Sequence, residues 1–122
     1  TEAGFEVEAH TVTHADLTLK RKGESQAEYL KRIRRELRLP RELILKHVGQ
    51  EAVWLAYPYG RWNKLVISMA IEEGYRAGVT VTRGATPFFV DPFKVGRNQV
   101  MNPVKGNAFE QLVKYFRGEV LQ

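Results

Sequence analysis

Short strand-like segments alternate with helix-like segments along this chain, and this order constrains the fold more than any other feature. The strand-like segments are rich in apolar or β-branched residues and lie at residues 4–9, 52–56 and 78–82. The helix-like segments carry capping signals or apolar residues at helical spacing and lie at residues 25–38, 40–49, 63–73 and 107–120. Strands that alternate with helices predict an α/β fold with parallel pairing. Because three or four strands form only a small sheet, we expect it to be part of a larger α/β domain.

Local signals set the ends of these segments. Ser25 with Glu28 three residues later is a capping box that begins the first helix, and Pro40 is expected to begin a second, short helix. The run Ala-Val-Trp-Leu-Ala at residues 52–56 is almost entirely apolar, which is typical of a parallel strand buried on both faces. A long loop rich in proline and phenylalanine is expected at residues 83–96.

The composition excludes several classes of protein. The chain has no cysteine, so disulfide frameworks, thiolate metal sites and cysteine nucleophiles are excluded. No apolar run approaches the roughly 20 residues of a membrane span, and the acidic first residues predict no signal peptide. Hydrophobic residues make up 43% of the chain, which is enough to build a packed core.

The net charge of +5 is a weak lead to a polyanionic partner. Many of the basic residues lie in one block at residues 20–42. A nucleic-acid site would place such a block on one face with aromatic residues interleaved. Tyr29 is the only aromatic residue there, and four glutamates dilute the charge. The block therefore favours a solvated helix face over a polyanion site, and a nucleic-acid partner is not expected.

The sharpest local feature is the segment His10-Thr11-Val12-Thr13-His14. Two imidazoles four residues apart can share one metal ion, although the spacing alone leaves a chance pair open. The residue after His10 is a threonine and not a glutamate, so this is not the zinc-protease motif with its built-in general base. The pair follows a predicted parallel strand, and sites on parallel α/β scaffolds gather at the C-terminal ends of strands.

The segment Tyr57-Pro58-Tyr59-Gly60 follows the next predicted strand. Such a turn can be a rigid connection from strand to helix. It can also present backbone N–H groups to a developing oxyanion. Its position after a strand repeats that of the histidine pair.

Two segments resemble signature blocks of one enzyme family. Residues 4–18 resemble the second block of the polysaccharide deacetylases (carbohydrate esterase family 4, the NodB-homology domain), in which two histidines enclose a Ser or Thr and two further positions, followed by Asp-Leu. Residues 56–63 resemble the third block, Arg-x-Pro-Tyr-Gly. The blocks occur in the family's order, about forty residues apart, and the resemblance covers about residues 4–100.

The resemblance implies the fold class α/β, as part of a distorted (β/α) barrel with its N-terminal strands missing. Residues 1–106 would be the C-terminal part of that deacetylase domain, and residues 107–122 an amphipathic helix packed on it. The missing N-terminal segment of the same domain is then an expected partner. Apolar strand residues near Phe5 or Trp54 are expected to be exposed where that segment would pair.

The same resemblance implies the activity and the cofactor. The family removes acetyl groups from N-acetylated sugars with a divalent metal, and zinc is the ion expected here. His10 and His14 would be two of three protein ligands. In the family an Asp-Asp pair supplies the third ligand and the general base. Asp16 and Asp91 are the only aspartates in this chain and they are not adjacent, so ligand and base are expected outside it.

The third block implies the remaining site residues. Tyr59 would offer its backbone N–H to the oxyanion, and Pro58 and Tyr59 would contact the sugar. Apart from this block, Arg83 and Arg97 flank the aromatic loop and could contact sugar hydroxyls, with a salt bridge or surface role as the alternative. The family's arginine falls on Ala56 here. The Tyr-Pro-Tyr-Gly version resembles the branch that deacetylates poly-β-1,6-N-acetylglucosamine in biofilm matrix. It implies an N-acetylglucosamine polysaccharide as partner and an extracytoplasmic location.

Two other classes of function remain open. The basic helix could make the chain a polyanion-binding module, whose binding would fall steeply with salt. The absent Asp-Asp pair also permits a non-catalytic carbohydrate-binding fragment. An Asp-Asp pair after an apolar strand upstream of residue 1 would favour the enzyme over the fragment.

Overall fold

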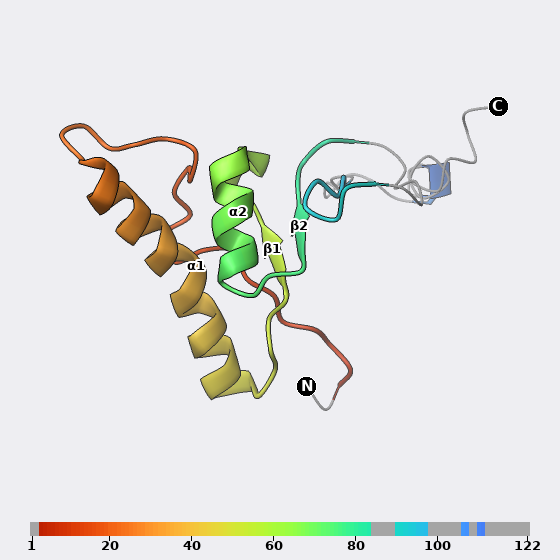
Figure 1. The fold of residues 1–122 in the computed structure, drawn as a ribbon. Coiled ribbons are helices and arrows are strands. Elements are labelled where there is room, and N and C mark those ends of the chain that lie inside the picture. The colour runs from red at the N-terminus through yellow and green to blue at the C-terminus, as the bar shows by residue number, and fades with distance from the viewer. Residues whose placement is uncertain (1–2, 84–89, 98–105, 108–109, 112–122) are drawn as a thin grey trace.

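The computed structural model describes residues 3–83, 90–97, 106–107 and 110–111. Within these ranges, helices and short strands alternate along the chain (Figure 1). The elements are helix α1 (Gln26–Val48), strand β1 (Trp54–Ala56), the 3₁₀ turn η1 (Pro58–Gly60), helix α2 (Lys64–Glu72) and strand β2 (Ala77–Val79). The predicted α/β order is therefore confirmed, and β2 is shorter than the strand expected at residues 78–82.

The strands pair in parallel, as the alternation predicts. β1 and β2 form a two-stranded sheet in which Leu55 lies opposite Gly78. Single parallel bridges extend the pairing on either side, from Ala9 to Leu55 and from Val79 to Val95. Four parallel segments therefore lie side by side, and their C-terminal ends meet at one edge of the sheet.

Within the described residues, the segment expected as a strand at residues 4–9 forms a parallel bridge to β1 at Ala9. This residue exchanges two backbone hydrogen bonds with β1, at 3.2 and 3.0 Å. Upstream of it, side chains take the place of backbone pairing. The Gln50 amide oxygen accepts from the Val7 N–H (2.8 Å), and the Glu8 carboxylate accepts from two N–H groups at the start of β1. The strand prediction is wrong before Ala9, because polar side chains satisfy the backbone groups that a ladder would use.

Helix α1 begins where the sequence predicts and continues further. The Glu28 N–H donates to Ser25 Oγ (3.1 Å), and the Ser25 N–H donates to the Glu28 carboxylate (2.9 Å). The helix then passes through Pro40 and ends at Gly49, whose backbone is left-handed. The expected break at Pro40 is therefore wrong. A proline removes one helical N–H, and burial of the Pro40 ring offsets that loss.

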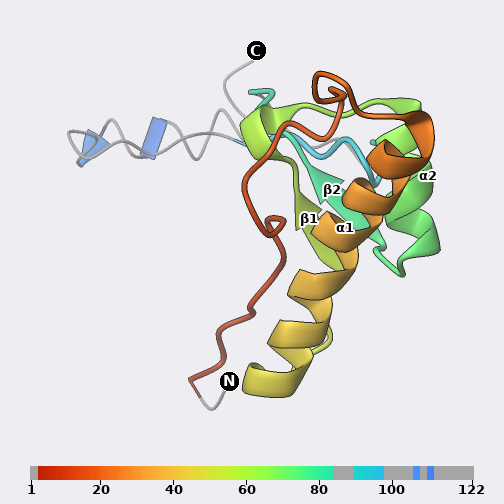
Figure 2. The ribbon, with the colours of Figure 1, turned by 90° about the vertical axis from the view of Figure 1, so that its left-hand side faces the viewer.

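Both helices lie on the same side of the β1–β2 pair (Figures 1 and 2). Leu55 of β1 is fully buried in a core that it shares with residues of α1 and α2, whereas its neighbour Trp54 is 40% exposed. The prediction of a strand buried on both faces is wrong within the described residues, because β1 is covered on one face only. Phe5 is also exposed, at 72%, so the expected exposure near Phe5 and Trp54 is confirmed.

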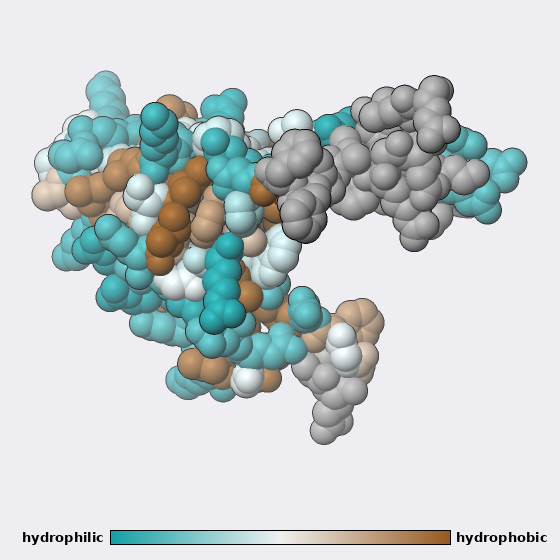
Figure 3. All heavy atoms as spheres, turned by 45° about the vertical axis from the view of Figure 1, so that its right-hand side comes forward, coloured by the Kyte–Doolittle hydropathy of each residue, from teal (hydrophilic) through white to brown (hydrophobic). Residues whose placement is uncertain are grey.

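Apolar atoms consequently reach the molecular surface among polar ones (Figure 3). The large apolar side chains that are exposed in the described chain are Phe5, Val12, Leu19, Leu43, Leu45, Val48, Trp54, Tyr59, Trp62, Ile71 and Val81. Such side chains are ordinary when scattered. Trp54 lies on β1, and Phe5 lies four residues before Ala9, which is bridged to β1.

Polar contacts fasten α1 to the other elements. The Arg41 guanidinium donates to the Ala52 carbonyl (2.6 Å) and to the Glu73 carbonyl, and it lies over the Tyr75 ring. The Tyr75 hydroxyl donates in turn to the Leu37 carbonyl (2.7 Å). These contacts join the helix to the chain before β1 and after α2.

Parts of two predictions lie outside the described residues. Of the helix expected at residues 107–120, only residues 107, 110 and 111 are described, and they are helical. Its packing on the domain, and the loop at residues 84–89, lie outside the described ranges. In the part of the chain that the structure does describe, every helix is too short or too polar to cross a bilayer.

Candidate functional site

The edge where the parallel segments end carries the residues that the sequence singles out. His10 directly follows the first bridged residue, and Tyr59 lies in the turn after β1. Arg83 and Arg97 come shortly after β2 and the second bridge. Ligand sites of parallel α/β sheets lie at this edge, so the topology brings the candidate segments to the expected place.

The two histidine rings contact one another. Their centroids are 4.6 Å apart with the ring planes at 73°. The His10 Nδ1 atom lies 2.8 Å from the carbonyl oxygen of Ala56. Because a carbonyl can only accept, Nδ1 carries the proton and Nε2 keeps a lone pair for a ligand. Metal-binding histidines are commonly oriented by a hydrogen bond of this kind.

A loop, not a helical turn, brings the two histidines together. Thr11 and His14 both have positive φ angles, 66° and 59°, and the His14 N–H donates to Thr11 Oγ1 (3.1 Å). With Tyr59 they are the non-glycine residues that have positive φ in the described chain. Such backbone conformations cost free energy and cluster at functional sites.

A carboxylate of α1 holds this loop. Glu36 is 2% exposed, and its oxygens accept hydrogen bonds from the Val12 N–H (2.8 Å), the Thr13 N–H (3.0 Å) and the Thr13 hydroxyl (2.6 Å). Burial raises the pKa of Glu36, but the hydrogen bonds from Thr13 and Val12 outweigh burial and lower the pKa below its ordinary value. The carboxylate is therefore charged at neutral pH.

The turn η1 forms the other half of the site. Its two hydrogen bonds are donated by the N–H groups of Gly60 (2.8 Å) and Arg61 (3.2 Å), so neither uses the N–H of Tyr59. The Tyr59 ring is 61% exposed and meets the His14 ring edge to face, with centroids 4.8 Å apart. The turn thus places Tyr59 against His14, and the two hydrogen bonds of the turn leave the Tyr59 N–H unused.

Close packing determines the shape of the turn. Gly60 has a φ of +66°, and a Cβ atom there would clash with Val81. The buried Tyr57 hydroxyl donates to the Phe93 carbonyl at 2.8 Å. Pro58 is fully buried, so its ring shapes the turn and is not open to solvent. The sugar contact expected of Pro58 stays a prediction.

An ion pair joins the histidine loop to the turn. Arg61 donates to the Asp16 carboxylate at 2.9 Å, and Asp16 also accepts from the N–H and hydroxyl of Thr18. Burial raises the pKa of Asp16, but the hydrogen bonds from Thr18 and Arg61 outweigh burial and lower the pKa below its ordinary value. Asp16, two residues after His14, is therefore joined to Arg61, which directly follows the Pro-Tyr-Gly turn.

The donors suit a divalent ion, but the set is incomplete in the described residues. Zinc takes imidazole nitrogens readily, and its protein sites use three or four protein ligands. In residues 3–83, 90–97, 106–107 and 110–111, no group of three or more histidine, cysteine or carboxylate side chains could hold an ion. Of the described residues, His10 and His14 could therefore supply two ligands and not a complete set.

Arg83 and Arg97 lie at the same edge of the sheet but not in contact with the histidines. The Arg97 N–H donates to the Thr82 carbonyl at 3.0 Å. Both side chains are exposed, and neither guanidinium has a hydrogen bond or ion pair within the described ranges. Both side chains are therefore open to a ligand, and the sugar contact expected of them stays a prediction.

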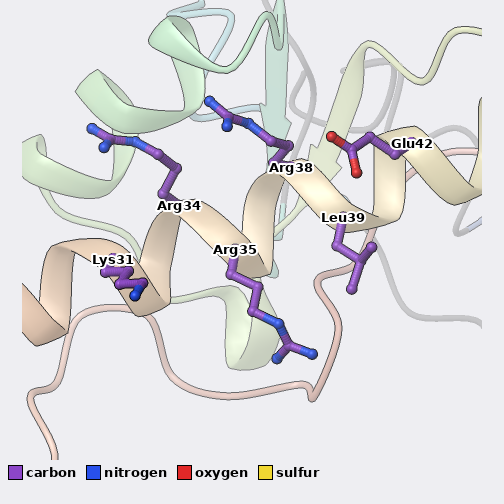
Figure 4. A pocket seen from close by; sticks show the side chains of 6 residues that line it. All are labelled: Lys31, Arg34, Arg35, Arg38, Leu39 and Glu42. Atoms are coloured by element: carbon purple, nitrogen blue, oxygen red, sulfur yellow. The ribbon is translucent and has the colours of Figure 1, made fainter.

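Most of the basic block lies on α1, where part of its charge is paired. Arg34 and Arg38 project to the side of α2 (Figure 4) and pair with Glu73 at 3.4 and 2.9 Å. A hollow of about 280 Å³ on this face is lined by Lys31, Arg34, Arg35, Arg38, Leu39 and Glu42. Because the Glu73 carboxylate, at the C-cap of α2, pairs with two of its arginines, the block is a partly paired helix face.

Sequence reasoning missed Glu36 and the Ala56 carbonyl. A signal for Glu36 was present, because Ile33, Leu37 and Pro40 place it on the buried stripe of α1, where an unpaired charge is costly. No signal marked the Ala56 carbonyl, since every residue carries one.

Solved deacetylase structures share this fold. The Streptococcus pyogenes deacetylase PplD in complex with acetate is 22% identical, with a TM-score of 0.72, over 86% of this chain and 43% of that chain. The polysaccharide deacetylase BC0361 from Bacillus cereus is 22% identical, with a TM-score of 0.72, over 93% and 33% of the two chains. The BpsB deacetylase domain from Bordetella bronchiseptica is 28% identical, with a TM-score of 0.55, over 62% and 28%.

These likenesses confirm the fold class, and this chain spans less than half the length of each of the three structures. No functionally curated protein matches it. A family model described as polysaccharide deacetylase matches residues 1–78, a range that holds both site histidines, Glu36 and the Pro-Tyr-Gly turn. Because this match covers more than half of the residues, the chain belongs to the polysaccharide deacetylase family.

Proposed function

We propose that this chain carries part of the active site of a metal-dependent N-deacetylase, which hydrolyses the acetamide groups of N-acetylglucosamine units in a polysaccharide. Membership of the family supports deacetylation as the reaction. The observation that carries the proposal is the histidine pair. The Ala56 carbonyl commits Nδ1 of His10, and the His14 ring lies against the His10 ring.

His10 and His14 would hold the divalent ion, and zinc suits their imidazole nitrogens. When bound, such an ion supplies Lewis-acid chemistry: it polarises the acetamide carbonyl and makes a water molecule easier to deprotonate. The chain itself orients the ligands, because Ala56 fixes the tautomer of His10 and Thr11 holds the backbone of His14.

The third ligand and the general base are proposed to be aspartates outside this chain. Asp16 is an unsuitable base, because Arg61 and Thr18 already occupy its carboxylate. The backbone N–H of Tyr59 is proposed to donate to the oxyanion that develops on the acetamide, since the hydrogen bonds of the turn do not use it. Arg83 and Arg97, both exposed at the same sheet edge, are proposed to contact sugar hydroxyls.

The substrate class is proposed to be poly-β-1,6-N-acetylglucosamine. The support is the Tyr-Pro-Tyr-Gly version of the turn, with alanine at position 56 in place of the family's arginine. An enzyme that acts on such a matrix polymer would work outside the cytoplasm, and the remainder of the same domain would complete its site.

Zinc titration of this chain, followed by calorimetry, tests the metal site. We expect weak binding, because two ligands are present, and loss of that binding in His10→Ala or His14→Ala. His47→Ala is the matched control, because it changes the third histidine of the chain, in the last turn of α1. Equal binding by all four proteins would contradict a site at His10 and His14.

Acetate release from β-1,6- and β-1,4-linked N-acetylglucosamine oligomers, with added zinc or cobalt, tests the reaction. The full-length protein is expected to release acetate, and His14→Ala should abolish release while the fold is kept. This chain alone is expected to be inactive, because loss of a general base typically lowers rates about 10²- to 10⁴-fold. Efficient release by this chain would contradict a base outside it. No release by the full-length protein with either metal would favour non-catalytic carbohydrate binding.

A further inference from the structure

The buried carboxylate of Glu36 is the least expected group in the described chain. It lies on α1 between Ile33 and Leu37, which are both fully buried in the core. Burying a charged group is costly unless hydrogen bonds or an opposite charge compensate it. Within the described residues Glu36 has no ion pair, so its hydrogen bonds must supply the compensation.

All three of its side-chain hydrogen bonds go to one place. They come from Val12 and Thr13, two of the three residues between His10 and His14. Two are backbone N–H groups, so the carboxylate fixes the path of the loop and not only one side chain. The loop would otherwise have to hold the left-handed backbone of Thr11 and of His14 without support from the core.

We propose that Glu36 is a positioning residue for the histidine pair: its carboxylate fixes the loop so that the His10 and His14 rings face one ion. This inference rests on the proposed metal site. Glu36 does not touch the rings, so its effect passes through the Val12 and Thr13 backbone. Side chains that orient metal ligands typically change metal affinity by about 10- to 100-fold when they are removed.

Three substitutions separate positioning from a merely structural role. Glu36→Ala leaves two N–H groups without their acceptor. Glu36→Gln keeps the shape: its amide oxygen can accept from both N–H groups, while the Thr13 hydroxyl turns to accept from the amide. Ile33→Val weakens the same helix packing and removes no hydrogen bond to the loop, so it is the control for lost stability.

Zinc affinity of the folded chain is the first measurement. We expect Glu36→Ala to weaken zinc binding about 10-fold or more, and Glu36→Gln and Ile33→Val to stay within a few-fold of wild type. Equal weakening by Glu36→Ala and Ile33→Val would overturn the proposal, because stability alone would then explain the loss. Equal weakening by Glu36→Gln and Glu36→Ala would also overturn it, because charge and not loop geometry would then be responsible.

Amide hydrogen exchange without metal is the second measurement. The His14 N–H donates to Thr11 and not to Glu36, so its protection reports the loop geometry indirectly. We expect this protection to fall in Glu36→Ala and to persist in Ile33→Val and Glu36→Gln. Retained protection in Glu36→Ala would overturn the positioning role. Failure of the wild-type chain to bind zinc would count against the metal site alone, because the exchange measurement does not depend on metal.

Discussion

The site depends on residues whose backbone or protonation is fixed by a neighbour. His10 has its tautomer set by one carbonyl, and His14 and Tyr59 adopt left-handed backbones. Thr11 accepts the His14 N–H, and the Tyr59 ring contacts the His14 ring. At the residue scale, the geometry of the pair is therefore a product of local strain and specific hydrogen bonds.

Gly60 is the residue at which a single methyl group should disturb the turn. Alanine there must adopt a left-handed backbone and would clash with Val81, so we expect Gly60→Ala to lower the free energy of unfolding by about 2–4 kcal/mol. Gly23 also has positive φ, but nothing lies within 4 Å of its would-be Cβ. Gly23→Ala should therefore cost only about 1–2 kcal/mol. Urea unfolding measures both, and equal losses would argue against the close packing of the turn.

Helix α1 is the element on which the site depends most. Its buried face carries Glu36 toward the histidine loop, and Arg41 fastens it to the chain before β1. Its N-terminal half is fastened as well, because Arg32 binds Glu24 at 2.7 Å and the Leu19 carbonyl at 3.0 Å. The helix therefore connects the loop after the histidines with the sheet.

The Glu24–Arg32 pair should make stability depend on pH. Hydrogen bonding from Arg32 lowers the pKa of Glu24 to about 2 in the folded protein, against 4.5 ordinarily. A lowered folded-state pKa stabilises the fold above the unfolded-state pKa, and this stabilisation disappears as the pH falls from about 5 toward 2. In Glu24→Gln we expect the melting temperature to vary less over this range.

Circular dichroism melts between pH 2 and 6 check this expectation. Glu42→Gln is the control, because Glu42 lies on α1, the helix that carries Arg32, and has no ion pair in the described part of the chain. An unchanged pH profile in Glu24→Gln would mean that the pair forms equally well in the unfolded chain.

At the scale of the molecule, both helices cover one side of the sheet, and among the described residues the other face of β1 is open at Trp54. Trp54 of β1 is exposed, while Leu55 beside it is buried. Ala9 is bridged to β1 on the side away from β2, and Phe5, four residues before Ala9, is exposed. Exposed apolar surface on a strand invites another chain or segment to bind.

We therefore expect this chain by itself to self-associate as its concentration rises. Trp54→Lys should shift the population toward monomer, because it places a charge on the open face of β1. Ile71→Lys is the matched control, because Ile71 is 54% exposed but lies on α2. Sedimentation velocity distinguishes them: the same shift in both variants would mean that the open strand face is not the contact.

Short-range chemistry explains what the sequence alone determined. The capping box at Ser25, the Asn63 cap of α2 and the apolar run of β1 involve residues close along the chain, so their elements could be predicted. The spacing of His10 and His14 likewise limits how far apart their rings can lie, and their motif with the Pro-Tyr-Gly turn points to the family.

Only the tertiary structure decided how the site is held. The bond from His10 to Ala56 joins residues 46 positions apart, and Glu36 lies 23 and 24 positions from its partners in the loop. The passage of α1 through Pro40 also depends on burial, which local propensity opposes. These outcomes depend on which groups lie together once the chain has folded. The Ala56 carbonyl and the Glu36 carboxylate find hydrogen-bond partners far away in the sequence, and burial of its ring stabilises Pro40 inside the helix.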